Sequence, residues 1–220
     1  VKMKKISVIA LLGYCVIGLL NSVFAQGDIW QEISRGDLDL KIVLVDFKDS
    51  RIIYIGTKNA ILKTEDGGET WRSILSIKGQ NKTVNFLLFD PQDKNSLYAA
   101  SGNGLFYSPN QGKDWKRIFQ GKNYLENECR SIAVLPTVIY LGTKGGLFVS
   151  KDRGRSWYKE KGKLGSSNIL AIACNLKEPN SIYVACIDGV FKTIDEGQSW
   201  ERIFVAHPVE NTDENNEVIE

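Results

Sequence analysis

The sequence predicts an all-β fold of the β-propeller type, with four four-stranded antiparallel blades, one extra N-terminal outer strand and a ring that these strands do not close. A pattern of about 43 residues recurs four times, with a tyrosine near its start and a tryptophan at its end. The closing tryptophans lie 44, 42 and 43 residues apart, and the tyrosines keep the same spacing. A fixed period of this size is typical of repeats that stack to bury their apolar faces. The copies span residues 53–71, 97–115, 139–157 and 182–200.

Residues 1–25 have the pattern of a secretory signal peptide. Three lysines precede an apolar run over residues 6–20, and Ala25 fits cleavage after a small residue. We therefore predict cleavage after Ala25 and a periplasmic or secreted protein. Two alternatives stay open: an uncleaved anchor over residues 6–25, which has the roughly 20 residues needed to span a bilayer, or a lipoprotein modified at Cys15. In each case membrane contact is expected only through this segment.

The charge balance of the remaining chain excludes one class of partner. Without the three lysines of the leader, 25 basic residues face 26 acidic ones. The last twelve residues hold five acids and no base, which predicts an acidic disordered tail over residues 206–220. The repeat domain, residues 26–205, is only mildly basic and lacks the dense Lys/Arg stripe of a nucleic-acid binder. We expect no nucleic-acid partner.

Each copy contains four short apolar runs separated by Gly, Asn, Asp and Pro clusters, which predicts a four-stranded meander. The first run is the most uniformly apolar, as in strands covered on both faces, and the last alternates apolar with charged residues, as in an outer strand. In the second copy the runs are 84–89, 96–100, 104–108 and 114–119, and the other first runs are 40–45, 131–135 and 169–174. The predicted blades cover residues 38–75, 82–119, 128–160 and 167–204.

The turn between the third and fourth runs has the pattern Ser/Thr-x-Asp-x-Gly-x-Ser/Thr-Trp. Its Asp can accept backbone N–H bonds, its Gly permits a positive φ, and its Trp can staple the hairpin through a large buried area. Copy two departs from the pattern, with Asn110 for Asp and Asp114 for Ser/Thr. One carboxylate per turn is too few for calcium, so we expect no metal and no cofactor. The positions are Asp66, Gly68 and Trp71; Asn110, Gly112 and Trp115; Asp152, Gly154 and Trp157; and Asp195, Gly197 and Trp200.

This turn resembles the Asp-box, or bacterial neuraminidase repeat, and the preceding Tyr-x-Gly/Ala-x-x-x-Gly-Leu/Val-Phe is similar to the photosystem II stability/assembly-factor-like family. The resemblance covers residues 30–203. It implies a propeller and, by analogy with assembly factors, the binding of another protein. Sialidases and xyloglucanases share the same fold, so the resemblance does not by itself decide the activity.

Trp30 lies 41 residues before Trp71 and begins the same alternating pattern as the other fourth strands. It predicts an extra outer strand for which the sequence offers no partner strands. Two explanations stay open. The chain is a shortened form of a longer propeller, or it is a four-bladed or open arc protected by a partner or by self-association, since an open sheet edge invites pairing.

A basic binding face is the candidate functional site. The loops that join the blades, and those between second and third strands, should open on one face, where lysines and arginines outnumber acids. The alternative is that these residues only solvate long loops. The candidates are Arg35, Lys58, Lys78, Lys82, Lys122, Arg130, Lys144, Lys161 and Lys163.

Catalytic readings find little support. The one histidine, His207, stands beside the tail, so no nucleophilic triad can be assembled in the body. Three cysteines follow the leader, and this odd number leaves at least one thiol without an intrachain partner.

We predict an exported, non-catalytic, protein-binding propeller, an assembly or scaffold factor for an envelope complex. The alternative is a carbohydrate-active enzyme or lectin-like module that binds glycan. Acids worth testing are Asp37, Asp39, Glu126 and Glu128, and the cysteines, whose pairing is open, are Cys129, Cys174 and Cys186.

Overall fold

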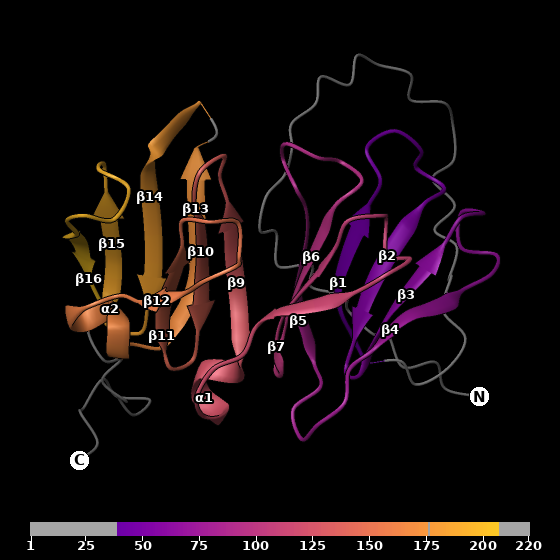
Figure 1. The fold of residues 1–220 in the computed structure, drawn as a ribbon, viewed down its shortest axis with the longest axis horizontal. Helices are drawn as coiled ribbons and strands as arrows, with labels where there is room; N and C mark the ends of the chain where they lie inside the picture. The colour runs from indigo at the N-terminus through magenta and orange to yellow at the C-terminus, as the bar shows by residue number, and fades with distance from the viewer. Residues whose placement is uncertain (1–38, 176, 207–220) are drawn as a thin grey trace, which may run out of the picture. The chain divides into compact units, whose positions relative to one another are not determined.

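The computed structural model describes residues 39–175 and 177–206, and these contain four antiparallel sheets of four strands each (Figure 1). In every sheet the strands lie in chain order, so each sheet is one meander. The strands are β1 (Leu40–Val45), β2 (Ile53–Thr57), β3 (Ala60–Thr64) and β4 (Arg72–Ser76); β5 (Val84–Phe89), β6 (Leu97–Ser101), β7 (Gly104–Ser108) and β8 (Lys116–Phe119); β9 (Cys129–Val134), β10 (Ile139–Thr143), β11 (Gly146–Ser150) and β12 (Tyr158–Lys159); and β13 (Ile169–Asn175), β14 (Glu178–Cys186), β15 (Gly189–Thr193) and β16 (Glu201–Val205).

The predicted all-β class and the four meanders are confirmed. Strands β1, β5 and β7 have the bounds expected from the apolar runs, and β8 begins two residues later than expected. The repeated tyrosine occupies the same register position in each sheet. Tyr54 pairs with Leu44 on one side and Lys63 on the other, and the tyrosines of the later sheets pair at the equivalent positions. The structure does not show a closed ring.

The sheets stack through their first strands, with β1 beside β5, β5 beside β9 and β9 beside β13. We call the face of a sheet that looks to the preceding sheet its leading face and the opposite one its trailing face. Between the first two sheets, Tyr54 and Ile61 of the trailing face pack against Leu87 and Leu97 of the next leading face. Two further clusters of buried side chains join the second sheet to the third and the third to the fourth. The core therefore lies between sheets.

One expectation about the first strands is wrong at the two ends of this stack. Strand β9 is buried almost throughout and β5 is buried or half-buried, as predicted. Strands β1 and β13 instead expose several apolar residues, Val43 and Leu170 among them. Each belongs to a sheet that has a neighbouring sheet on one face only among the described residues, so its other face stays in contact with solvent.

Two short helices, α1 (Tyr124–Asn127) and α2 (Gly162–Ser166), lie in the loops that lead into β9 and β13. The sequence pattern did not predict them. Asn123 caps α1, since its Oδ1 accepts hydrogen bonds from the backbone N–H groups of Leu125 and Glu126 at 3.0 and 3.1 Å. No helix in the described part of the chain is long and apolar enough to cross a membrane. The predicted leader, the Trp30 strand and the acidic tail lie outside the described residues.

Candidate functional site

The Asp-box turns form one end of each repeat, and their polar side chains bond to one another. In the third copy, Asp152 accepts hydrogen bonds from the backbone N–H of Ser156 at 2.8 Å and from its hydroxyl at 2.5 Å. The Ser150 hydroxyl donates to Asp152 at 2.8 Å and accepts from the backbone N–H of Gly154 at 2.8 Å. These bonds confirm the predicted role of the acid and add a role for the first hydroxyl of the box.

The hydrogen bonds within the boxes also change the acidity of their carboxyl groups. Those from the side chain and then the backbone of Ser156 lower the pKa of Asp152 to about 2. Those from Ser199 and Thr193 lower the pKa of Asp195 to about 2. The carboxylates are therefore ionised at neutral pH, and their charge is stabilised by donors inside the turn.

Each box places two successive residues at positive φ. In the third copy these are Arg153 at 61° and Gly154 at 87°, while the first copy uses Gly67 and Gly68. A Cβ at Gly154 would come within 2.7 Å of the Ile118 side chain in the preceding sheet. Glycine is therefore required there both for its backbone conformation and for a close approach between sheets.

Copy two keeps the turn although two of its residues differ from the pattern. The amide nitrogen of Asn110 donates to the Asp114 carboxylate at 2.7 Å, and its oxygen accepts the backbone N–H of Asp114 at 2.8 Å. In this copy the amide of Asn110 takes the place of the boxed carboxylate, and the carboxylate of Asp114 takes the place of the hydroxyl. The same two positions still bond to each other. The turn therefore tolerates this exchange of residues.

The box tryptophans of the second, third and fourth sheets pack against the preceding sheet, whereas the sequence predicted only that each staples its hairpin to its own blade. Trp157 packs its ring 5.3 Å from that of Phe119 and donates its indole N–H to the Ile118 carbonyl of the preceding sheet at 2.9 Å. Trp115 also packs against the apolar cluster between the first and second sheets, but it donates its indole N–H to the Gly112 carbonyl of its own turn at 3.1 Å. Trp71 is half-buried and has no preceding sheet among the described residues.

A contact that the sequence reasoning missed also joins two sheets at the box end. Arg153 forms an ion pair with Asp90, whose side chain is 1% exposed, and donates to the Leu135 carbonyl at 3.2 Å. Asp90 also accepts the backbone N–H of Gln92 at 2.9 Å, as expected for its turn. The only sequence signal is a basic residue inside one box, which does not reveal a partner 63 residues away.

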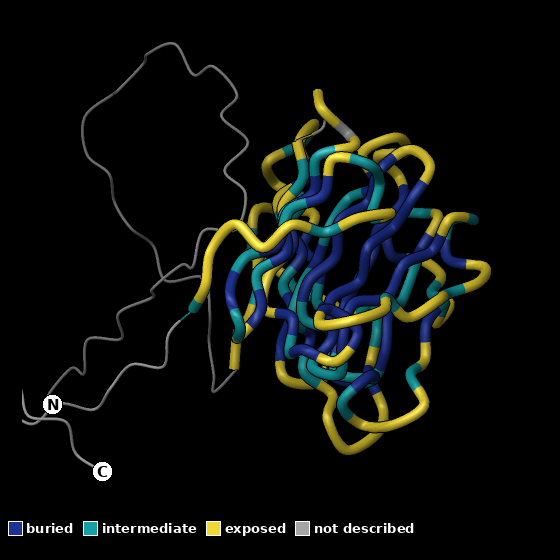
Figure 2. Tube along the Cα trace, turned by 90° about the vertical axis from the view of Figure 1, so that its left-hand side faces the viewer, coloured by how far each residue is buried: buried dark blue, intermediate teal, exposed yellow. Residues whose placement is uncertain are grey.

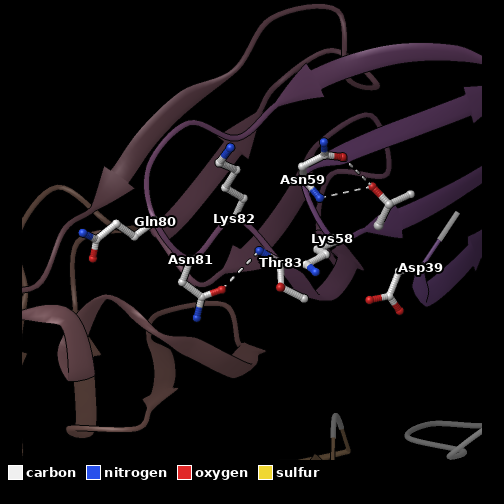
Figure 3. Close-up of a pocket in the computed structure, with 8 residues that line it drawn as sticks. Asp39, Lys58, Asn59, Gln80, Asn81, Lys82 and Thr83 are labelled. Carbon is white, nitrogen blue, oxygen red and sulfur yellow. Dashed lines mark hydrogen bonds between the residues drawn. The ribbon is translucent and has the colours of Figure 1, made fainter.

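The opposite end of the repeats holds a cleft of about 690 Å³ between the first and second sheets (Figure 3). It lies where the β2–β3 turn meets the loop that links β4 to β5, so the predicted convergence of these two kinds of loop is found here. Figure 3 shows Gln80 and Asn81 at one side of the cleft and Asp39 at the other. The lining residues are Asp39, Thr57, Lys58, Asn59, Gln80, Asn81, Lys82 and Thr83.

The loops around this cleft are held by the second sheet. Asn103, in the β6–β7 turn, donates its amide N–H to the Lys78 carbonyl at 2.5 Å, and the Thr83 carbonyl accepts the backbone N–H of Gly102 at 2.9 Å. The Thr57 hydroxyl accepts the backbone N–H of Ala60 at 3.1 Å and fixes the β2–β3 turn. These bonds hold the backbone of the loops that line the cleft, so the cleft is formed without a ligand.

The predicted basic residues divide into two groups. Lys58 and Lys82 line the cleft, and neither forms an ion pair with a residue that the structure describes. Arg130 and Lys144 instead share Glu128, at 2.7 and 3.8 Å, and Lys163 pairs with Asp188 at 3.0 Å. Lys78, Lys122 and Lys161 do not line the cleft and also lack an ion pair among the described residues; Arg35 lies outside them.

The acids singled out for testing are engaged in structural contacts. Glu126 is buried; burial raises its pKa, but hydrogen bonds from Lys159 and the backbone of Lys122 outweigh this and lower it. Glu128 bonds to Arg130, and Asp39 pairs with Lys41 at 2.5 Å. Asp37 lies outside the described residues. The cleft thus offers two cations, several amide groups and one carboxylate, Asp39, which is paired with Lys41. The two cations and the amides are suited to holding carboxylates and peptide groups.

A family model described as photosynthesis system II assembly factor YCF48 matches residues 23–157. This protein belongs to the YCF48 family. The match includes every residue that lines the cleft. No curated protein matches the sequence.

Solved structures support the fold of this YCF48-family chain. An ancestral GH74 enzyme superposes with a TM-score of 0.63 at 20% identity, over 85% of this chain and 26% of that one. The GH74 enzyme of Niastella koreensis gives 0.59 at 18%, over 76% and 30%. A YCF48 bound to a D1 peptide gives 0.56 at 18%, over 80% of this chain and 58% of that one. At these identities the likeness shows propeller blades, and the chain spans only part of each relative's length.

Proposed function

We propose that this protein is an exported, non-catalytic member of the YCF48 family that binds a segment of a partner protein and assists the assembly of an envelope complex. The observation that carries the proposal is the family match, which includes the cleft. A structural relative of the same family is a YCF48 with a peptide bound to it, which supports a polypeptide ligand here.

The cleft residues suggest the chemistry of that segment. Lys58 and Lys82 are exposed cations without an ion pair among the described residues, and Asn59, Gln80 and Asn81 provide donors and acceptors for a peptide backbone. The volume of about 690 Å³ lies within the usual range of ligand sites. We infer an extended segment that carries carboxylates, from acidic side chains or from a chain end.

A binding assay with synthetic peptides tests this site. A fluorescein-labelled acidic decapeptide is titrated with the purified protein by anisotropy, beside a neutral peptide of the same length. We expect the Lys58→Ala, Lys82→Ala double variant to weaken binding of the acidic peptide by about tenfold or more, the equivalent of about 1.4 kcal/mol. Higher salt should weaken it further, because exposed charges are screened.

Lys113→Ala provides the matched control, because Lys113 is an exposed lysine of an Asp-box turn, at the other end of the repeat. It should bind the acidic peptide as the unaltered protein does. Equal affinity for acidic and neutral peptides, or equal losses in the double variant and the control, would contradict the proposed site.

The similarity to GH74 enzymes supports a second candidate, a carbohydrate-active protein. Assays with xyloglucan and fluorogenic glycosides, together with a glycan array, decide between the two. Glycoside cleavage that is abolished by Glu128→Gln or Arg130→Ala would favour the enzyme over the peptide-binding protein. The proposed export is tested separately by fractionation and by N-terminal sequencing, where we expect Gln26 as the first residue.

A further inference from the structure

The loops at the cleft end of the repeats are bonded to one another in a row. In each linking loop, the carbonyl of the residue just before the first strand accepts a backbone N–H from the next sheet's turn between its second and third strands. These bonds run from Gly102 to Thr83 at 2.9 Å, from Lys144 to Glu128 at 3.0 Å and from Ile187 to Asn168 at 3.3 Å. The β6–β7 turn also leads into β7, where Leu105 pairs with Phe119 at the start of the second linking loop. This turn therefore lies between the loop that lines the cleft and the second linking loop.

The second linking loop, residues 120–128, is held in one shape by its own polar groups. The Asn127 side-chain oxygen accepts the backbone N–H of Gly121 at 3.0 Å, and the Glu126 carboxylate accepts that of Lys122 at 2.8 Å. Glu126 is buried and forms an ion pair with Lys159 of β12 at 2.9 Å. Because these bonds lie within the protein, the loop has this shape without a ligand.

This fixed loop presents an aromatic side chain to solvent. Tyr124 is 74% exposed, more than any other large hydrophobic residue that the structure describes, and it is the only aromatic residue in the three linking loops. Lys122 beside it is exposed and has no ion pair with a described residue. Figure 2 shows exposed loops and turns around a largely buried interior. Tyrosine is common at binding surfaces, because its ring offers a large contact area at a low cost in conformational entropy.

We propose that Tyr124 and Lys122 form a second contact for the polypeptide that occupies the cleft, so that the bound segment runs past the β6–β7 turn from one linking loop to the next. This inference rests on the proposed function of the cleft. Packed sheets lie about 10 Å apart and an extended chain rises about 3.3 Å per residue, so about three to five residues span the two contacts. The segment therefore combines carboxylates, held by Lys58 and Lys82, with an aromatic or aliphatic side chain that packs on the Tyr124 ring.

A series of labelled acidic peptides tests the second contact by anisotropy. Each peptide carries one phenylalanine about three to five residues to either side of its acidic cluster, and a reference peptide has alanine instead. Tyr124→Ala should weaken binding of the best phenylalanine peptide by about fivefold or more, because an aromatic pair is lost, and should leave the alanine peptide nearly unchanged. Tyr158→Ala is the matched control. Tyr158 is an exposed tyrosine of β12 beside Lys151 of an Asp-box turn, and its variant should bind both peptides as the unaltered protein does.

The second contact and the cleft site fail in distinguishable ways. If Tyr124→Ala binds every phenylalanine peptide as the unaltered protein does, while the Lys58→Ala, Lys82→Ala variant loses them, the second contact is wrong and the cleft site stands. Equal losses for the phenylalanine and alanine peptides in Tyr124→Ala would also overturn the second contact. If the lysine variant too binds all peptides normally, both proposals are wrong. Thermal melts that match the unaltered protein establish that the variants fold.

Discussion

The two ends of the repeat differ in how much freedom the sequence has. At the Asp-box end, the side chain of the boxed Asp or Asn accepts the backbone N–H of the residue four positions later in every copy, and the same two positions have positive φ. At the other end, the three linking loops differ in sequence, and only the second and third carry a helix, α1 and α2. The first linking loop and the β2–β3 turn leave Lys82 and Lys58 exposed at a cleft. The residues of the box end are therefore constrained by the fold, whereas the loop residues of the other end can vary with the ligand that the protein binds.

The largest expected effect concerns two tryptophans at the same box position. Trp157→Ala removes a ring packed on Phe119 and a hydrogen bond to the preceding sheet, so it should lower the free energy of unfolding by about 3–5 kcal/mol. Trp71→Ala should cost clearly less, because Trp71 has no preceding sheet to pack on among the described residues and donates only to Gly68 of its own turn. Urea melts of the two variants measure the difference, and equal losses would contradict a tryptophan that connects sheets.

The next effect tests the ion pair between sheets. Arg153→Ala leaves the buried Asp90 carboxylate without its charged partner, and hydrogen bonds to charged groups contribute about 1.5–3 kcal/mol. We expect a loss of that size in urea melts. Gln111→Ala, at the same box position in copy two, removes a side chain that bonds only to the exposed Asn95, and it should cost less than half as much.

Copy two allows a double-mutant test of the turn. Asn110→Asp places a second carboxylate against Asp114 and replaces the donor of the 2.7 Å bond, so it should destabilise the protein by about 1 kcal/mol. Adding Asp114→Ser restores the pattern of the other boxes and should recover most of this loss. A double variant no more stable than Asn110→Asp alone would show that the two positions are independent.

Acid should weaken the turns of the box end. The folded-state pKa of Asp152 and Asp195 is about 2, below the unfolded value of about 3.9. The two ionised carboxylates therefore stabilise the folded state above pH 4, and this stabilisation is lost as the pH falls toward 2. Urea midpoints between pH 5 and 2 should fall less steeply in the Asp152→Asn, Asp195→Asn variant than in the unaltered protein. Parallel profiles would contradict this assignment.

The smallest effect is expected at the cleft. Lys82 is exposed and without an ion pair among the described residues, so Lys82→Ala should change the free energy of unfolding by no more than about 0.5 kcal/mol. Thermal melts check this value. A larger loss would mean that the linking loop also carries part of the stability, and the contrast between the two ends would fail.

Patterns within one repeat predicted the fold well, because turn chemistry and apolar runs act over a few residues. The bounds of β5 and β7 and the bonds of Asp152 follow from neighbours in the sequence. Contacts between repeats were harder to predict. Arg153 contacts Asp90, which lies 63 residues away in the sequence, and the local sequence around either residue does not predict the contact.

The candidate site was predicted only in part, for a related reason. The loop geometry of a meander predicts that the turn with Lys58 and the linking loop with Lys82 open on one face, but it does not predict which basic residues line a cleft. That Glu128 bonds to Arg130 and Lys144 depends on side-chain positions in the loop around α1, which the sequence does not reveal. The exposure of Val43 depends on which sheets flank β1, information that no single repeat contains.

The chain-order arrangement of strands in every sheet also bears on how such proteins change in length. No described strand completes its hydrogen-bonded sheet with a strand from another repeat. A duplication or loss of one 43-residue unit would leave every remaining meander intact, and only the partners at the ends of the row would alter. Gene rearrangement can therefore add or remove whole blades without rethreading the chain, and evolution can tune the number of blades separately from the fold of each one.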